Sequence, residues 1–340
     1  MMVKVNMKKH PTIKDIAKMA GTTHSTVSRV ITGNATISEK MKTKVLRLMK
    51  KLHYHPNLIA RGLVRKKTRA FAMIVPDLNP HVLPIVRGAA ETCRIHNYGL
   101  MLFSTDYWMD ENKYFVEVVK NWQVDGVLIY NVVYRKDVSA TIKKMKKEKM
   151  PFVFINKYLG AKKVNTVSVD NKDAVFQAVS RLAGQGRSRI GMMNGGLISV
   201  DGVERFEGYK AALEKLGIKF DGNIVGNANF SGDEAYAEMK RILETAERPD
   251  AVFCANDEMA TGVIRALRER NLSVPGDVSV IGYDDWEGAR FFKPALTTLR
   301  PPLKEIGPLA IDLLMKVIKD PKRRIEEIGL KAELITRDSA

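Results

Sequence analysis

The chain opens with a short amphipathic pattern whose apolar residues recur at helical spacing. Thr12 and Asp15 have the spacing of a capping box, in which each side chain bonds the other residue's backbone, and Gly21 follows as a stop signal. The apolar face between these signals comprises Ile13, Ile16, Ala17 and Ala20. We therefore predict a short helix between Thr12 and Gly21.

A second helix pattern begins almost at once, with Thr22 or Thr23 as its cap and Gly33-Asn34 as its end. Its inward face comprises Val27, Val30 and Ile31. Two helices joined by so tight a turn must cross steeply, which is helix-turn-helix geometry. A third helix starting at Ser38 supplies the apolar side chains against which both can pack, namely Val45, Leu48, Met49 and Leu52.

From Ala70 onward, short apolar runs alternate with amphipathic stretches long enough for crossover helices. The runs are FAMIV (71–75), LMLFS (100–104), GVLIY (126–130), FVFI (152–155), RIGMM (189–193), AVFC (251–254) and VSVIGY (278–283). This alternation predicts parallel sheets with helices on both faces. So many units in one chain suit two lobes better than a single sheet.

Charge is concentrated at the start of the chain. Residues 1–69 contain 17 lysines and arginines against Asp15 and Glu39, whereas the remaining 271 residues hold 39 basic and 36 acidic side chains. A small basic domain on a nearly neutral one attracts a polyanion such as DNA. The alternative is a disordered basic tail or a solvated face, and the run Lys143–Lys149 is most simply the solvated face of a helix.

The rest of the composition is that of a soluble globular protein. Hydrophobic residues make up 45% of the chain, and Cys93 and Cys254 are too few and too distant in sequence for a disulfide framework. No apolar run approaches the ~18 residues of a membrane span, and residues 1–11 lack an apolar signal core. We expect a cytoplasmic protein.

The outward face of the second helix carries side chains that suit DNA. Near the start of that helix His24 and Ser25 can reach base edges, and Arg29 can grip guanine through two hydrogen bonds. Smaller polar side chains are better phosphate partners, namely Thr23, Thr26, Ser28 and Asn34. The alternative is that these exposed side chains are merely solvated.

A conditional hinge follows the third helix. Pro56 breaks that helix, and Asn57 can cap a further helix, 58–64, which is too short to be stable alone in water. The alternative is an ordinary linker that packs on the core.

The order of these residues closely resembles the lactose-repressor (LacI/GalR) family of bacterial transcription regulators. The resemblance lies in TIKDIAK, in STVSRV and in the Y-x-P-N-x-x-A-R-x-L pattern from Tyr54 to Leu63. It continues through VRGAAE, VDGVLI, PDAVFCANDEMATG and VPGDVSVIGYDD. The resemblance implies that the hinge orders on DNA, with Asn57 and Ala60 in the minor-groove segment and Leu63 inserted between base steps.

The resemblance also implies the domain organisation. Residues 1–56 form the helix-turn-helix domain, 57–69 the hinge and linker, and 70–340 a two-lobed core like the periplasmic sugar-binding proteins. The first lobe is expected over about 70–156 and 298–320, and the second over about 158–295 and 321–340. The chain is thus expected to cross between lobes near residues 156–158, 294–299 and 320.

Polar residues that follow the apolar strands are candidates for ligand binding, because ligands of such folds lie at the carboxyl ends of the strands. The resemblance adds an effector-gripping arginine and a stacking aromatic, while His81 stands where aromatics are common. The predicted effector site comprises Asn79, His81, Asn156, Arg205, Phe230, Asn256 and Asp284. Asp77, Asp257 and Asp285 are interpreted instead as helix caps.

These observations predict a homodimeric transcription regulator, most simply a repressor, whose affinity for a pseudo-palindromic operator is switched by a small molecule such as a sugar. We expect no catalytic residue, cofactor or metal; His53 and His55 form the only histidine cluster and lack thiolate or carboxylate neighbours. The main alternative is a sugar sensor whose basic N-terminus merely associates with nucleic acid. An enzyme on the two-lobed scaffold is a more distant alternative.

Overall fold

The computed structural model describes residues 11–31, 36–52, 54, 68–75, 78–104, 124–130, 139–157, 163–197, 199–245 and 247–340. The chain divides into two compact units, Met1–Thr68 and Arg69–Ala340. The division falls within the stretch 57–69 that the sequence predicts as hinge and linker.

The first unit contains the three predicted helices, α1 (Ile13–Ala20), α2 (His24–Ile31) and α3 (Glu39–Lys51). The capping box of α1 is present: the Thr12 amide donates to Asp15 Oδ2 at 2.8 Å, and the Asp15 amide donates to Thr12 Oγ1. Gly21 ends α1 in the left-handed region, with φ of +66°, where a side chain would be strained. Of the two candidate caps for α2, Thr23 is the one whose hydroxyl accepts from the Thr26 amide.

The apolar faces of these helices meet in one small core. Ile16, Val27 and Val45, one from each helix, are completely buried, and Leu48, Met49 and Leu52 pack around them. Each helix is too short to persist alone in water, so this shared core is what stabilises the unit. The predicted end of α2 at Gly33-Asn34 lies outside the described residues.

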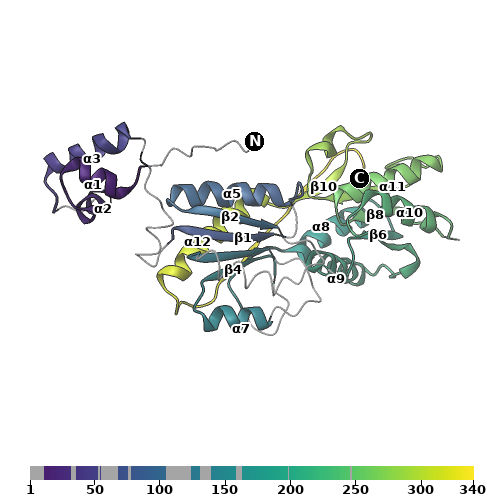
Figure 1. Ribbon diagram of the computed structural model, residues 1–340. Coiled ribbons are helices and arrows are strands. Elements are labelled where there is room, and N and C mark those ends of the chain that lie inside the picture. Colours follow the sequence, from purple (N-terminus) through teal and green to yellow (C-terminus); the bar gives the residue numbers. More distant parts are fainter. Residues whose placement is uncertain are drawn as a thin grey trace, which may run out of the picture. The chain divides into compact units, whose positions relative to one another are not determined.

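The second unit is built on two parallel-type sheets with helices on both faces (Figure 1). The first lobe has the strand order β11-β5-β4-β3-β1-β2, with every pair parallel. Its strands are β1 (Ala70–Val75), β2 (Gly99–Ser104), β3 (Gly126–Tyr130), β4 (Phe152–Ile155), β5 (Thr166–Val169) and β11 (Glu327–Leu330). Its helices are α5 (Val82–Ile95), α7 (Ser139–Lys147) and α12 (Leu303–Lys319).

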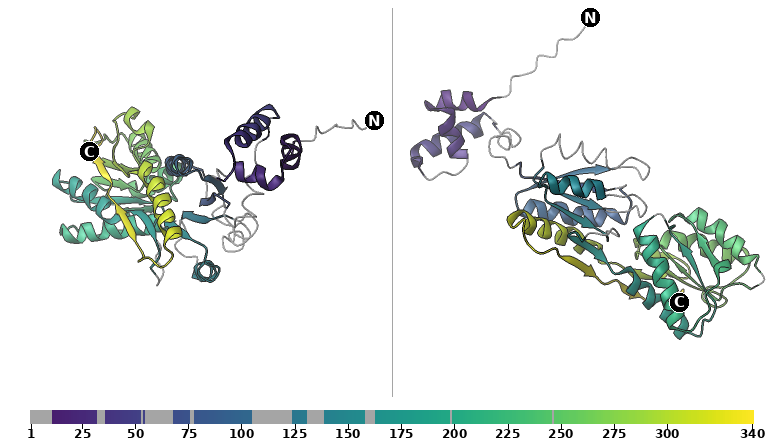
Figure 2. Two further views of the ribbon diagram at one scale, coloured as in Figure 1. Left: turned by 90° about the vertical axis from the view of Figure 1, so that its left-hand side faces the viewer. Right: turned by 90° about the horizontal axis from the view of Figure 1, so that it is seen from below.

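The second lobe repeats this arrangement of a sheet between helices (Figure 2). Its strand order is β12-β10-β9-β8-β6-β7. Its strands are β6 (Ile190–Asn194), β7 (Val225–Asn227), β8 (Ala251–Cys254), β9 (Ser279–Tyr283), β10 (Thr297–Arg300) and β12 (Glu333–Ile335), and β12 alone among these runs antiparallel to its neighbour. Its helices are α8 (Asn171–Gly184), α9 (Val200–Lys215), α10 (Gly232–Leu243) and α11 (Asp257–Glu269), with short 3-10 turns η1 (Gly222–Ile224) and η2 (Glu287–Phe291). The predicted class, a helix-turn-helix domain plus a two-lobed parallel α/β core, is confirmed.

The strands predicted from apolar runs are all present. A strand covered on both faces needs an apolar side chain at nearly every position, so a continuous apolar run is a reliable sign of one. In β1, for example, all six residues are buried. Five further strands were not predicted from the sequence, namely β5, β7, β10, β11 and β12. Two of these, β11 and β12, lie at sheet edges and are only partly buried, so they carry no continuous apolar run.

The predicted crossings between lobes are wrong, each by one strand. The chain stays in the first lobe through β5 and crosses at Asp170, and β10 belongs to the second lobe, so the next crossing follows Arg300. The last crossing lies between β11 and β12, at Lys331 and Ala332. Strands without an apolar run gave no sequence signal of which sheet they join, since their pairing depends on tertiary contacts.

The first lobe depends on a close crossing of α5 and α12. A side-chain carbon added at Gly88 would lie 2.7 Å from Pro308 Cδ and 2.9 Å from the Lys304 carbonyl oxygen. One added at Gly307 would overlap the Ile85 carbonyl and the Ala89 amide. The two helix backbones therefore touch because glycine stands at both contact points.

Replacing Gly307 by alanine should separate these helices and destabilise the second unit by about 1–3 kcal/mol, the usual cost of overpacking. The measurement is the urea midpoint of the full chain. Gly184→Ala is the matched control, because an added carbon there meets nothing within 4 Å and alanine favours the helix. Equal midpoints for the two variants would contradict the close-crossing interpretation.

Candidate functional site

The second helix of the first unit presents the predicted base-reading side chains to solvent. His24, Ser25 and Arg29 are all exposed on α2, whereas Val27 and Val30 are buried in the small core. The helical period thus separates one face for packing from one face for contact. This is the arrangement that a recognition helix needs in a major groove.

The predicted phosphate partners are placed less uniformly. The Thr23 and Thr26 hydroxyls lie 3.1 Å apart, and Thr23 also caps α2, so both take part in the turn that starts the helix. Ser28 is half-buried. Asn34 lies outside the described residues, as do the hinge residues Asn57, Ala60 and Leu63. Their predicted roles remain predictions.

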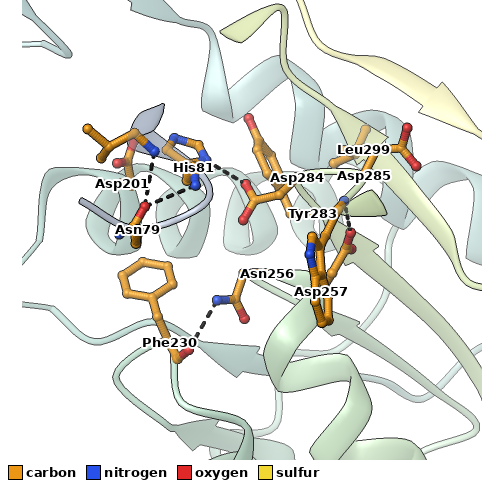
Figure 3. A network of polar contacts seen from close by, with 12 residues as sticks. Asn79, His81, Asp201, Phe230, Asn256, Asp257, Tyr283, Asp284, Asp285 and Leu299 are labelled. Atoms are coloured by element: carbon orange, nitrogen blue, oxygen red, sulfur yellow. Dashed lines mark hydrogen bonds and ion pairs between the residues drawn. The ribbon is translucent and has the colours of Figure 1, made fainter. Parts of the chain in front are cut away.

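Two predicted effector residues meet across the junction between the lobes. His81, just before α5 in the first lobe, has its Nδ1 3.0 Å from Oδ1 of Asp284, which follows β9 in the second lobe (Figure 3). Both side chains are about one-fifth exposed. The pair joins positions 203 residues apart and links the lobes directly.

A second contact across the junction uses Asn156, at the end of β4. Its amide nitrogen donates to Asp201 Oδ2 on α9 at 3.0 Å. The neighbouring Lys157 Nζ lies 2.9 Å from Glu204 Oε1, also on α9. We call the set His81, Asn156, Lys157, Asp201, Glu204 and Asp284 the lobe junction.

Arg205 lies behind the lobe junction and is only 3% exposed. Its Nε donates to Asn171 Oδ1 at 3.2 Å and its Nη1 donates to the Ala255 carbonyl. The guanidinium carbon stands 3.7 Å from the centre of the Tyr283 ring and 5.9 Å from that of Phe230. The predicted effector arginine is therefore held rigidly by hydrogen bonds and aromatic faces.

Asn171 connects this arginine to the carboxylates. Its amide nitrogen donates to Asp201 at 3.0 Å and to Glu204 at 3.1 Å, while its oxygen also accepts from the Tyr283 hydroxyl. No role was predicted from the sequence for Asn171, Asp201 or Glu204. The available signal was spacing, since Asp201 precedes Arg205 by one helical turn and therefore shares its face of α9.

The other predicted effector residues hold the backbone as well. Asn79 Oδ1 accepts from the His81 and Val82 amides, both at 3.0 Å, and so starts α5. Asn256 caps α11 through the Met259 amide and donates to the Phe230 carbonyl at 3.1 Å (Figure 3). These contacts fix the loops at the lobe junction, and any ligand role for the two asparagines is additional to them.

The interpretation of Asp257 and Asp285 as caps is wrong. Asn256 is the cap of α11, while Asp257 accepts from the Trp286 amide and the Thr298 hydroxyl. Burial raises the pKa of Asp257 well above its usual range, and the nearby charge of Asp284 raises it further. Asp285 is bound by Arg300 and Arg337, whose hydrogen bonds outweigh the effect of burial and lower its pKa. Asp77 lies outside the described residues.

Three of the nine described non-glycine residues with a positive φ are predicted effector residues. Asn156, Phe230 and Asp284 have φ of +68°, +62° and +111°, values that non-glycine residues seldom adopt. Such strain persists only where surrounding contacts over-determine it, and it is frequent at ligand sites. The strained positions are three of the seven that sequence analysis selected.

Within the described residues, no group of three or more histidine, cysteine, aspartate or glutamate side chains is placed to hold a metal ion. His53 and His55 lie outside that part of the chain. No helix that the structure describes is long and apolar enough to cross a membrane.

A three-helix unit that exposes a polar helix face, joined to a two-lobed α/β unit with polar groups at the lobe junction, defines the class of ligand-responsive DNA-binding regulators. Comparison with known proteins identifies the family. Residues 12–57 match "Bacterial regulatory proteins, lacI family", and residues 179–340 match "Periplasmic binding protein-like domain". The chain belongs to the LacI family of bacterial transcription regulators.

Relatives and solved structures agree with this assignment. The HTH-type transcriptional repressor PurR of Mannheimia succiniciproducens is 34% identical, with 96% of this chain and 98% of the relative covered. The Lac repressor dimer bound to operator and the anti-inducer ONPF matches with a TM-score of 0.88 at 25% identity, over 97% of this chain and 99% of the other. The transcriptional regulator CelR in complex with cellobiose matches with a TM-score of 0.74 at 30% identity, over 97% and 100%. These relatives are transcription regulators and not enzymes, so the prediction that this chain is not an enzyme is confirmed.

The His81–Asp284 contact should make the stability of the second unit depend on pH. Burial lowers the pKa of His81, but the charge and hydrogen bond of Asp284 raise it more, so the net pKa lies above its ordinary 6.5. A histidine whose pKa is raised by folding stabilises the folded state fully at pH values below its pKa in the unfolded chain. This stabilisation is lost as the pH rises through its pKa in the folded chain. The thermal advantage of the unaltered chain over His81→Gln should therefore shrink as pH increases from 6.5 upward.

The matched control is His96→Gln, which removes another histidine–aspartate contact, 3.4 Å to Asp312, on the exposed surface of the first lobe. The difference in thermal midpoint between His96→Gln and the unaltered chain should stay constant across the pH series. If the thermal midpoints of the unaltered chain and His81→Gln differed by the same amount at every pH, the predicted coupling between His81 protonation and stability would be contradicted.

Proposed function

We propose that this chain is a homodimeric repressor whose α2 helices read the half-sites of a pseudo-palindromic operator, and whose operator affinity is switched by a sugar bound at the lobe junction. The observation that carries the proposal is the lobe junction itself. There, three carboxylates of the second lobe, with a buried arginine and an aromatic ring close behind them, meet the His81, Asn156 and Lys157 side chains of the first lobe.

The chemistry of these groups suits a polyhydroxyl ligand. Asp201 and Asp284 are hydrogen-bond acceptors for sugar hydroxyls, and Phe230 offers an aromatic face to a sugar ring. Solved relatives support the same class, since CelR was solved with cellobiose and another family member from Enterococcus faecium with ribose. Purines, which are planar and hydrogen-bonding, are the competing ligand class that the test below includes.

The switch follows from where the ligand would act. Asp201 and Asp284 are bonded across the junction to Asn156 and His81, so a ligand that takes over either carboxylate replaces a direct link between the lobes. A ligand shifts a conformational equilibrium only through such differential contacts. The change of lobe angle would alter the spacing of the two hinge segments in a dimer, and with it the grip of Leu63 on DNA.

The proposal that the chain is a homodimer rests on its similarity to the Lac repressor, which was solved as a dimer bound to operator DNA. Two-fold symmetry in the protein matches a pseudo-palindromic site, because each subunit then reads an equivalent half-site.

Arg29→Ala should weaken operator binding by about 1–3 kcal/mol, the cost of losing one bidentate base contact. The measurement is a mobility-shift titration at fixed salt, on an operator selected from random duplexes with the full chain. Arg47→Ala is the control, since Arg47 is an exposed arginine on α3 with the same charge. If Arg29→Ala lowered the affinity for selected and scrambled duplexes equally, Arg29 would contact phosphate rather than a base.

The effector assignment is tested by thermal shift of the full chain with ribose, cellobiose, adenine and guanine. A sugar should raise the apparent stability by mass action and change the operator affinity of the same sample. Asp284→Asn should weaken that sugar about tenfold or more, because it removes a charged acceptor. Asp312→Asn, an exposed carboxylate of the first lobe, is the control.

Stabilisation by purines alone would contradict the sugar assignment. Binding of a sugar with no change in operator affinity would contradict the switch while leaving the site in place.

A further inference from the structure

The first lobe has one end where the chain enters and another where the lobe junction lies. All six strands are parallel, so their amino ends share one edge of the sheet and their carboxyl ends share the opposite edge (Figure 1). The chain enters at the amino-end edge: the Arg69 amide donates to Asp125 at 3.0 Å and its carbonyl accepts from Gly99 at 2.8 Å. Residues 1–68, which carry the DNA-reading helix, are therefore tethered to this edge by the chain.

The segments that meet at this edge are rich in lysine and arginine. The end of α7 and the turn into β4 contain five lysines and one glutamate between Lys143 and Lys149. The turn between α12 and β11 lies beside the start of β5, since Glu326 bonds both Asn165 and Thr166. We call the exposed cations of these segments the basic face: Lys143, Lys146, Lys147, Lys149, Lys163, Lys319, Lys322 and Arg324.

The basic face has few compensating charges. None of its eight cations forms an ion pair with another described residue, and the exposed acids of the same segments are only Glu148, Asp320 and Glu327. Lys163 and Arg324 line a surface hollow with Ile325 and Glu327. Residues 70–340 are nearly neutral as a whole, with 39 basic and 36 acidic side chains, so the excess of exposed cations over exposed acids in these segments is a local feature.

We propose that the basic face binds the phosphate backbone of DNA flanking the operator. The inference rests on the proposed function, because the partner is the DNA that residues 1–68 hold. Lysine acts as a point charge towards phosphate, and seven of the eight cations are lysines, which suits contacts that carry no sequence information. Tethering raises the effective concentration of flanking DNA at this face, so weak individual contacts suffice.

An acidic protein is a less suitable partner. Protein interfaces depend on a few buried aromatic or arginine anchors surrounded by a polar rim. None of the exposed aromatic side chains among the described residues belongs to these segments. The only large apolar side chain exposed among these described segments is Ile325, so the face offers mainly charge, as a backbone-binding surface does.

The test compares one operator in two duplexes, one ending at the half-sites and one extended by about 10 base pairs, one helical turn, at each end. For each, the affinity of the full chain is measured against salt concentration. The unaltered chain should bind the extended duplex more tightly and with a steeper salt dependence. Each phosphate contact contributes about 0.9 to the slope of log K against log salt.

Two variants each remove three charges while keeping the side-chain stems: Lys146→Gln with Lys147→Gln and Lys149→Gln, and Lys163→Gln with Lys322→Gln and Arg324→Gln. Each should lower the slope by up to about 3 on the extended duplex and leave the short duplex unchanged. The control removes three exposed cations of the second lobe, Lys219, Arg268 and Lys293, and should leave both duplexes unchanged.

Equal affinity of the unaltered chain for both duplexes, or equal losses from the control and the test variants, would overturn the inference. In that case a specific, salt-dependent affinity for the short duplex would leave the proposed function intact and would point to an acidic protein as the occupant of the face. Failure to select any operator would instead sink the proposed function itself.

Discussion

The buried positive charge of Arg205 is the constraint around which the second unit is organised. A guanidinium that is almost removed from water must be compensated by hydrogen bonds, opposite charge or aromatic faces. Asn171, the Ala255 carbonyl and the Tyr283 ring satisfy it directly, and Asp201 and Glu204 lie on the far side of Asn171. Those carboxylates in turn need donors, and the first lobe supplies them from Asn156 and Lys157.

A conformational switch can arise from this chain of dependence. Because the second lobe holds carboxylates and the first lobe holds their donors, the junction is satisfied only when both lobes contribute. Under the proposed function, a ligand that offers hydroxyl donors would compete with the first lobe for the same oxygens, and its binding would be coupled to the arrangement of the lobes through those shared atoms. The strained backbone at Asn156 and Asp284 is consistent with positions held by contacts from both sides.

In the second unit, different groups lie at the two ends of the parallel strands. Carboxyl ends of strands carry the junction groups, and amino ends carry the entry of the chain and the basic face. The nearly neutral charge of residues 70–340 as a whole does not reveal this local excess of cations. In the first unit the corresponding separation is made by the helical period, which buries Val27 and Val30 and exposes Arg29.

What the sequence determined by itself was local. The capping box at Thr12 and Asp15, the glycine stop at Gly21 and the continuous apolar runs of the central strands act over a few neighbouring residues, so pattern alone predicted those elements. Tertiary structure decided which sheet each short edge strand joins, that Asn256 rather than Asp257 caps α11, and that Asn171 links Arg205 to two carboxylates. The pairing of the edge strands and the link through Asn171 depend on partners that lie far apart in the sequence, as His81 and Asp284 do at 203 positions, and no local pattern encodes such a contact.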